Sequence, residues 1–237
     1  NHIVFESRSP GADSLRWIRA DGAGEARPLL ESMDTLLPYS FSPDGKRLAF
    51  AESGMDTEFD LWTLPLDVSD LDHPKPGKPE LYLRTPFKEV EPAFSPDGRW
   101  IAYASDESGR NEVYVRSFPS GAPSGSGKWQ ISTGGGFHPI WSRDGRELFY
   151  QTLDNRIMVS TYAAKADSFA ADKPRPWSNT PIFDPSARRG SVDLAPDGKR
   201  FAVFPRPAAA AGQKGSVHVT VLLNFFDELR RKVPVGK

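Results

Sequence analysis

Short runs in which apolar and polar residues alternate follow one another along most of the chain. Examples are RLAFAES at 47–53, EVYVRSF at 112–118 and RFAVFP at 200–205. Clusters of Gly, Pro, Asp and Ser separate these runs, as turns separate the strands of an antiparallel sheet. The pattern predicts an all-β protein built from many short strands.

One strand–turn–strand unit occurs four times. Its copies are FSPDGKRLAF at 41–50, FSPDGRWIAY at 94–103, WSRDGRELFY at 141–150 and LAPDGKRFAV at 194–203. The turn aspartates are Asp44, Asp97, Asp144 and Asp197, at spacings of 53, 47 and 53 residues. A period near 50 residues is typical of β-propeller blades. We expect each aspartate to be structural, because its carboxylate can bond nearby backbone N–H groups and hold the turn.

Each copy has the composition of a four-stranded antiparallel blade. A short apolar strand precedes the Asp-Gly turn, and two further strands rich in aromatic and β-branched residues follow it. A less regular fourth strand closes most copies, and four such strands make one blade of a propeller. Residues 1–237 are therefore predicted to form one propeller domain. Its expected blades are 1–31, 32–85, 86–133, 134–182 and 183–224.

The two ends of the sequence depart from the repeat. HIVFESR at 2–8 aligns with RLAFAES, so the first blade is predicted to lack its inner strand and its Asp-Gly turn. The last blade has no obvious fourth strand. We expect about five blades from a larger ring, such as a six-bladed parent, or a ring closed by an unusual strand pairing. The tail FFDELRRKV at 225–233 predicts a short helix, with acidic residues near its start and basic residues near its end.

The blade sequences resemble a known family. FSPDGRWIAYASDESGRNEVYVRSF at 94–118 and GGGFHPIWSRDGRELFYQTLDNRIMVS at 134–160 are similar to blades of TolB-like, WD-repeat-like bacterial propellers. VTVLLNFFDELRRKVP at 219–234 resembles the end of such propellers in bacterial serine/threonine kinases. The resemblance implies a kinase domain and a membrane helix ahead of a propeller that is periplasmic or otherwise extracytoplasmic. Motifs of this kind are specific for a fold and uninformative about function.

Composition narrows the classes of partner and chemistry. Thirty basic residues oppose 31 acidic ones, which gives no basis for nucleic-acid binding. No apolar run approaches the roughly 18 residues of a membrane helix, so this segment is not expected to insert into a membrane. The chain has no cysteine, which excludes disulfides, cysteine nucleophiles and thiolate metal sites.

The sequence lacks the motifs of several common nucleotide-binding, catalytic and metal sites. GAPSGSGKW at 121–129 lacks the first Gly and the final Ser or Thr of a phosphate-binding loop. No serine lies in a Gly-x-Ser-x-Gly nucleophile elbow, and no two histidines have metal-ligand spacing. We therefore expect no catalytic residues, no metal and no cofactor.

A binding site, if present, is expected at the mouth of the central channel. The loops that enter the inner strands are 32–37, 86–91, 133–138 and 184–190. Acidic, basic, imidazole and aromatic side chains from these loops are the candidate ligand-binding residues: Asp34, Phe87, Glu89, Glu91, His138, Arg188 and Arg189. Together they can hold a peptide end or a charged segment through charge-assisted hydrogen bonds.

Two functions from different classes remain open. The first is a non-enzymatic module that binds a protein or peptide, as a sensor or scaffold domain of a bacterial envelope or kinase-linked protein. The alternative is a propeller accessory domain, or a lyase or hydrolase acting on peptide or sugar at the central channel. Open blade edges also allow self-association, because an unpaired strand edge can pair with another chain.

Overall fold

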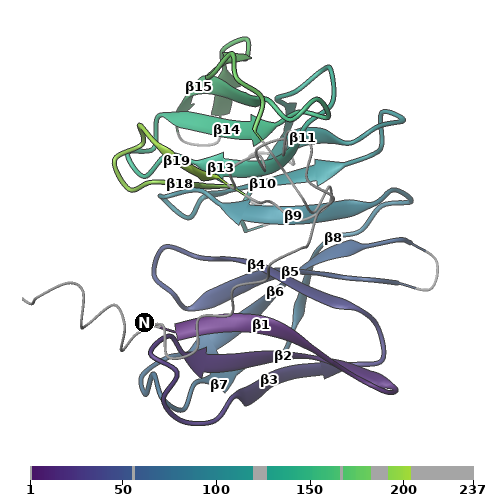
Figure 1. The fold of residues 1–237 in the computed structure, drawn as a ribbon. Coiled ribbons are helices and arrows are strands. Elements are labelled where there is room, and N and C mark those ends of the chain that lie inside the picture. The colour runs from purple at the N-terminus through teal and green to yellow at the C-terminus, as the bar shows by residue number, and fades with distance from the viewer. Residues whose placement is uncertain (1, 55–56, 120–126, 166–167, 183–191, 204–237) are drawn as a thin grey trace, which may run out of the picture.

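The computed structural model describes residues 2–54, 57–119, 127–165, 168–182 and 192–203. Every regular element in these ranges is a β-strand, and the strands form successive antiparallel sheets stacked around an axis (Figure 1). The predicted all-β propeller of antiparallel blades is confirmed. The predicted helix at 225–233 lies outside the described residues, and the blade limits stay a prediction. The described ranges contain no helix with the length and hydropathy needed to cross a membrane.

The sheets follow one another in chain order. The first contains β1 (His2–Ser9), β2 (Ala12–Arg19) and β3 (Arg27–Ser32). The second contains β4 (Leu36–Phe41), β5 (Arg47–Glu52) and β6 (Asp60–Asp67), with β7 (Lys75–Pro76) and β8 (Glu80–Leu83) both paired to β6. The third contains β9 (Glu89–Phe94), β10 (Trp100–Ser105), β11 (Glu112–Ser117) and β12 (Lys128–Gln130).

The remaining sheets keep the same internal order. The fourth contains β13 (Phe137–Trp141), β14 (Glu147–Gln151), β15 (Ile157–Lys165) and β16 (Ser168–Ala171), with β17 (Arg175–Pro176) also paired to β15. In the fifth, the structure describes β18 (Val192–Leu194) and β19 (Phe201–Val203). In each of the last four sheets the first strand lies at an edge, and these four edge strands, which line one pocket, are the inner strands of the blades.

The Asp-Gly turns share one geometry. In the third blade, Gly98 has a φ of 70°, which a residue with a Cβ rarely adopts. Asp97 Oδ1 accepts hydrogen bonds from Ser95 Oγ at 2.6 Å and from the Arg99 backbone N–H at 3.1 Å. The second and fourth blades repeat both bonds at their own turns. Asp197 keeps the bond from the backbone N–H, of Lys199, but has no serine donor, because Ala195 replaces the serine; Arg200 Nε donates to its other oxygen at 2.9 Å.

The core lies between adjacent blades. Strands β5, β10 and β14 are almost completely buried, because an inner strand covers one edge and neighbouring sheets cover both faces. The equivalent strand β1 is only half-buried along its length. The recurring aromatic residues of the repeat lie in this core: Phe50, Phe94, Tyr103, Tyr114 and Trp141 are buried, and Phe41 and Trp62 are partly buried against the same clusters. Burial of such side chains is the main contribution to the free energy that holds the blades together.

Candidate functional site

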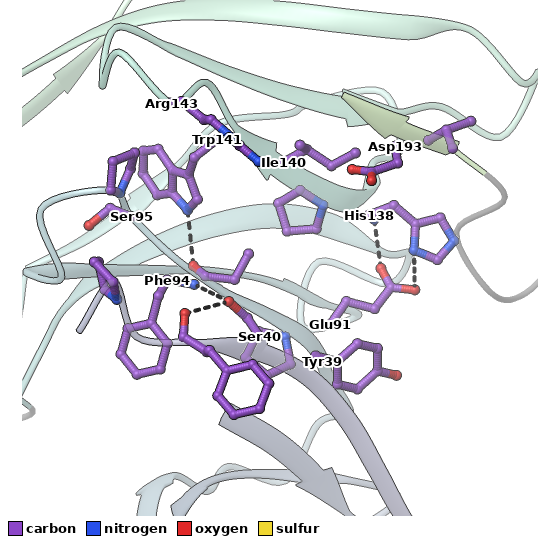
Figure 2. Close-up of a pocket in the computed structure, with 17 residues that line it drawn as sticks. Tyr39, Ser40, Glu91, Phe94, Ser95, His138, Ile140, Trp141, Arg143 and Asp193 are labelled. Carbon is purple, nitrogen blue, oxygen red and sulfur yellow. Dashed lines mark hydrogen bonds and ion pairs between the residues drawn. The ribbon is translucent and has the colours of Figure 1, made fainter. Parts of the chain in front are cut away.

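A pocket of about 880 Å³ lies between the inner strands of four blades. Its walls are the inner strands β4, β9, β13 and β18, together with residues of the turns that follow them (Figure 2). Four blades that are far apart in the sequence therefore contribute to one cavity, which we call the channel pocket. Its size lies in the range of ordinary small-ligand sites, roughly 300–1,000 Å³.

Glu91 and His138 occupy the same position in successive blades, three residues before Phe94 and Trp141. Both have a positive φ, 60° for Glu91 and 52° for His138, and a proline follows each of them. The pairing of β9 with β10 and of β13 with β14 shifts register at these residues, as it does at a β-bulge. Such a conformation costs of order 1–3 kcal/mol at a residue with a side chain. A bulge re-aims the side chain it carries, and here it turns both side chains into the channel pocket.

The two side chains contact each other directly. His138 Nδ1 lies 2.9 Å from Glu91 Oε1, and the His138 backbone N–H donates to Glu91 Oε2 at 2.6 Å. Only 9% of the His138 side chain and 11% of the Glu91 side chain are exposed. Both carboxylate oxygens thus bind one residue, which fixes the imidazole ring. Carboxylate-held imidazoles of this kind accept and return protons in acid–base chemistry.

Other polar groups in the pocket wall connect adjacent blades. The Phe94 backbone N–H donates to Ser40 Oγ at 3.1 Å, which links the inner strands of the second and third blades. Trp141 Nε1 donates to the Ala93 carbonyl at 2.9 Å, which links the third and fourth. These bonds hold neighbouring inner strands at a fixed separation, so the walls of the pocket are in place without a ligand.

Of the candidate ligand-binding residues, the structure brings Glu91 and His138 together in the pocket. Asp34 and Phe87 lie on the entry loops and do not line the pocket, and 42% of Phe87 is exposed. Arg188 and Arg189 lie outside the described residues.

Glu89 also lies away from the pocket. Its carboxylate is buried, and Thr85 Oγ1 donates a hydrogen bond to it. Burial raises the pKa of Glu89 to about 7, and the neighbouring carboxylate of Asp60 adds to the effect. Glu89 is therefore a group in the core between two blades rather than a ligand contact at the channel.

Besides Ser40 and Ser95, three polar pocket residues were not among the candidates. Tyr39, Arg143 and Asp193 line the channel pocket from β4, from the turn after β13 and from β18. For Arg143 the sequence carried a signal: SRDG at 142–145 has arginine where the other three turns have proline. For Tyr39 and Asp193 no local signal distinguishes them from other strand residues.

Among the described residues, the charged groups of the pocket do not form a cluster of metal ligands. Within the described ranges, no group of three or more His, Asp and Glu side chains converges in a way that could hold a metal ion. The chemistry available to the described pocket residues is hydrogen bonding, charge recognition and proton transfer.

No protein-family model matches the chain. Among curated proteins, the uncharacterized peptidase YuxL of Bacillus subtilis (strain 168) is 28% identical to this chain over 109 residues. The matched segment is 46% of this chain and 16% of that protein. The chain thus matches about a sixth of the length of the peptidase.

Solved structures with the same architecture carry different functions. A protein assigned as TolB from Agrobacterium tumefaciens has a TM-score of 0.58 at 16% identity, over 86% of this chain and 71% of that one. A puromycin-hydrolyzing peptidase from Mycobacterium tuberculosis has a TM-score of 0.55 at 16% identity, over 85% of this chain and 34% of that one. A protein assigned as a 6-phosphogluconolactonase from Bacteroides uniformis has a TM-score of 0.56 at 18% identity, over 84% and 59%.

These findings correct the functional expectation. We expected a non-enzymatic protein- or peptide-binding module with no catalytic role, and this was wrong: the curated relative is named a peptidase. The repeat motifs of the blades could not make this distinction, because they encode turns and core rather than chemistry. Association with a kinase and an extracytoplasmic location stay predictions. In fold, the chain is a TolB-like β-propeller.

Proposed function

We propose that this chain is the propeller domain of a peptide hydrolase and that its channel pocket holds the peptide substrate. The observation that carries the proposal is the Glu91–His138 pair, which two positive-φ bulges direct into the pocket. The similarity to a curated peptidase supports the same reading. This is the alternative that the sequence left open, an accessory propeller acting on peptide at the central channel.

The pair suits a polar, extended ligand. Glu91 holds the imidazole of His138 by two contacts, so the ring is oriented before any substrate arrives. A ring held in this way can hydrogen-bond a peptide group or exchange a proton with it, and pre-orientation lowers the entropic cost of binding. Strained backbone is retained at a site where the surrounding structure fixes it and where it serves a function.

The pocket volume sets the size of the ligand. About 880 Å³ accommodates a peptide of a few residues and not a folded protein. The chain carries neither a cysteine nor the Gly-x-Ser-x-Gly pattern. The proposal therefore assigns to the described residues the holding and orienting of substrate, and not the attack on the scissile bond.

The test uses the natural polypeptide that contains this sequence, with a panel of short peptides as substrates and release of free amine as the readout. We expect His138→Gln and Glu91→Gln to lower kcat/KM at least tenfold, because each change breaks the oriented pair. His73→Gln is the matched control: His73 also bonds a carboxylate, Asp70, at 2.9 Å, but on the exposed surface. Absence of both peptide cleavage and peptide binding, or full activity of His138→Gln, would contradict the proposal.

A further inference from the structure

The fourth blade differs from the others at one residue of its turn. Pro43 and Pro96 precede the turn aspartate in the second and third blades, and Pro196 does so in the fifth, but Arg143 takes this position in the fourth. Pro43, Pro96 and Arg143 all line the channel pocket. One arginine therefore stands among prolines at the end of the pocket nearest the Asp-Gly turns.

Among the described residues, none engages the guanidinium of Arg143. Arg143 is exposed, and within the described ranges it has no ion-pair or hydrogen-bond partner. The neighbouring Arg146, by contrast, lies 4.0 Å from the carboxylate of Asp144 on the outside of the turn. Figure 2 shows Arg143 beside Trp141, on the opposite side of the view from His138.

Other donors near Arg143 are already committed. Ser95 Oγ donates to Asp97 at 2.6 Å, and Trp141 Nε1 donates to the Ala93 carbonyl at 2.9 Å. The prolines have no backbone N–H to offer. Among the described side chains at this end of the pocket, Arg143 is thus the strong donor left for a ligand, and its planar fork fits a carboxylate through two parallel bonds.

The charge at the other end of the pocket has the opposite sign. Glu91 and Asp193 place carboxylates there, next to His138 (Figure 2). His138 and Arg143 are five positions apart in the chain, and a fully extended chain spans at most about 18 Å over that separation. An extended peptide of four or five residues has the same length, and with free ends it is positive at one end and negative at the other.

We propose that Arg143 binds the C-terminal carboxylate of a short peptide whose remaining residues run along the inner strands toward Glu91 and His138. The inference rests on the proposed peptide-hydrolase function and adds the substrate class, peptides with a free C-terminus, and the direction in which they lie. The three proline-bearing turns show that the fold does not need arginine at this position.

The experiment measures calorimetric binding of the peptide Ala-Ala-Phe-Ala-Ala, as the free acid and as the C-terminal amide, to the intact protein. We expect amidation to weaken binding at least tenfold. Arg143→Gln and Arg143→Pro should bind the acid as weakly as the original protein binds the amide, with no remaining difference between the two peptides. Arg143→Pro restores the residue of the other three turns, and circular dichroism confirms that the variant is folded. Arg146→Gln is the matched control and should behave as the original protein.

The outcomes separate the two proposals. If acid and amide bind the original protein equally, the carboxylate site is overturned while peptide binding stands. If an amidated peptide with an internal aspartate binds as tightly as the free acid, Arg143 binds an acidic side chain, and the terminal-carboxylate proposal is wrong. If neither peptide binds and no peptide of the wider panel is cleaved, the proposed function itself fails.

Discussion

Replacing Glu89 by glutamine should make the protein more stable, and increasingly so as the pH rises from 4.5 to 8. Glu89 is the first residue of β9. It is 1% exposed and lies between the second and third blades. The Thr85 hydroxyl donates to one carboxylate oxygen, while Oε2 is buried with no hydrogen-bond partner among the described residues. Burial raises the pKa of Glu89 from its usual 4.5 to about 7, because the charged form has lost its water.

The magnitude follows from linkage. Each pH unit between the folded and unfolded pKa values corresponds to 1.36 kcal/mol, so ionised Glu89 costs the folded state roughly 3 kcal/mol. The sign is that of a raised acid pKa: the folded protein holds the proton more tightly than the unfolded chain does. Below about pH 4.5 the penalty is absent, between 4.5 and 7 it grows, and above 7 it is complete. A glutamine side chain at this position keeps an acceptor for Thr85 and stays neutral, so the Glu89→Gln variant escapes the penalty.

The assay is urea unfolding followed by tryptophan fluorescence at pH 4.5, 6, 7 and 8, for the original protein, Glu89→Gln and a control. Glu58→Gln is the control, because the Glu58 side chain is 70% exposed. We expect the difference in the free energy of unfolding between Glu89→Gln and the original protein to grow by 2–4 kcal/mol, roughly, across this range. The control should show no such trend. A difference that stays constant with pH would refute the reasoning that burial governs this carboxyl.

Two further changes test the turns and the packing of the blades. Gly136→Ala should destabilise the protein by roughly 1–3 kcal/mol, because the added Cβ would lie 2.5 Å from the buried Ser132 Oγ. Gly134→Ala, where nothing lies within 4 Å of the added atom, should be nearly neutral, and equal thermal midpoints for the two variants would contradict the clash. Asp97→Ala should cost roughly 1–2 kcal/mol through loss of the bonds from Ser95 Oγ and from a backbone N–H. An unchanged urea midpoint for this variant would mean that the turn does not depend on its aspartate.

The sequence alone was sufficient for the fold because its signals are local. A tight turn needs a residue that accepts positive φ, and Gly98 and its three counterparts supply it. Alternation of apolar and polar residues on either side of each turn specifies strands with one buried face. Repetition of this unit about every 50 residues then leaves few architectures other than a propeller. The aromatic core positions follow from the same alignment of repeats.

The candidate site depended on tertiary structure, because its parts meet across blades. Glu91 and His138 are 47 residues apart, and they touch because the ring places equivalent positions of neighbouring blades side by side. Glu89 and Glu91 differ by two residues, and regular alternation would turn both to the same face. The bulge at Glu91 breaks that alternation, so one carboxylate enters the pocket and the other is buried between sheets. The sequence determined which turns and strands form, whereas the packing of blades around one axis decided which side chains share a cavity, since no local rule encodes contacts between separate blades.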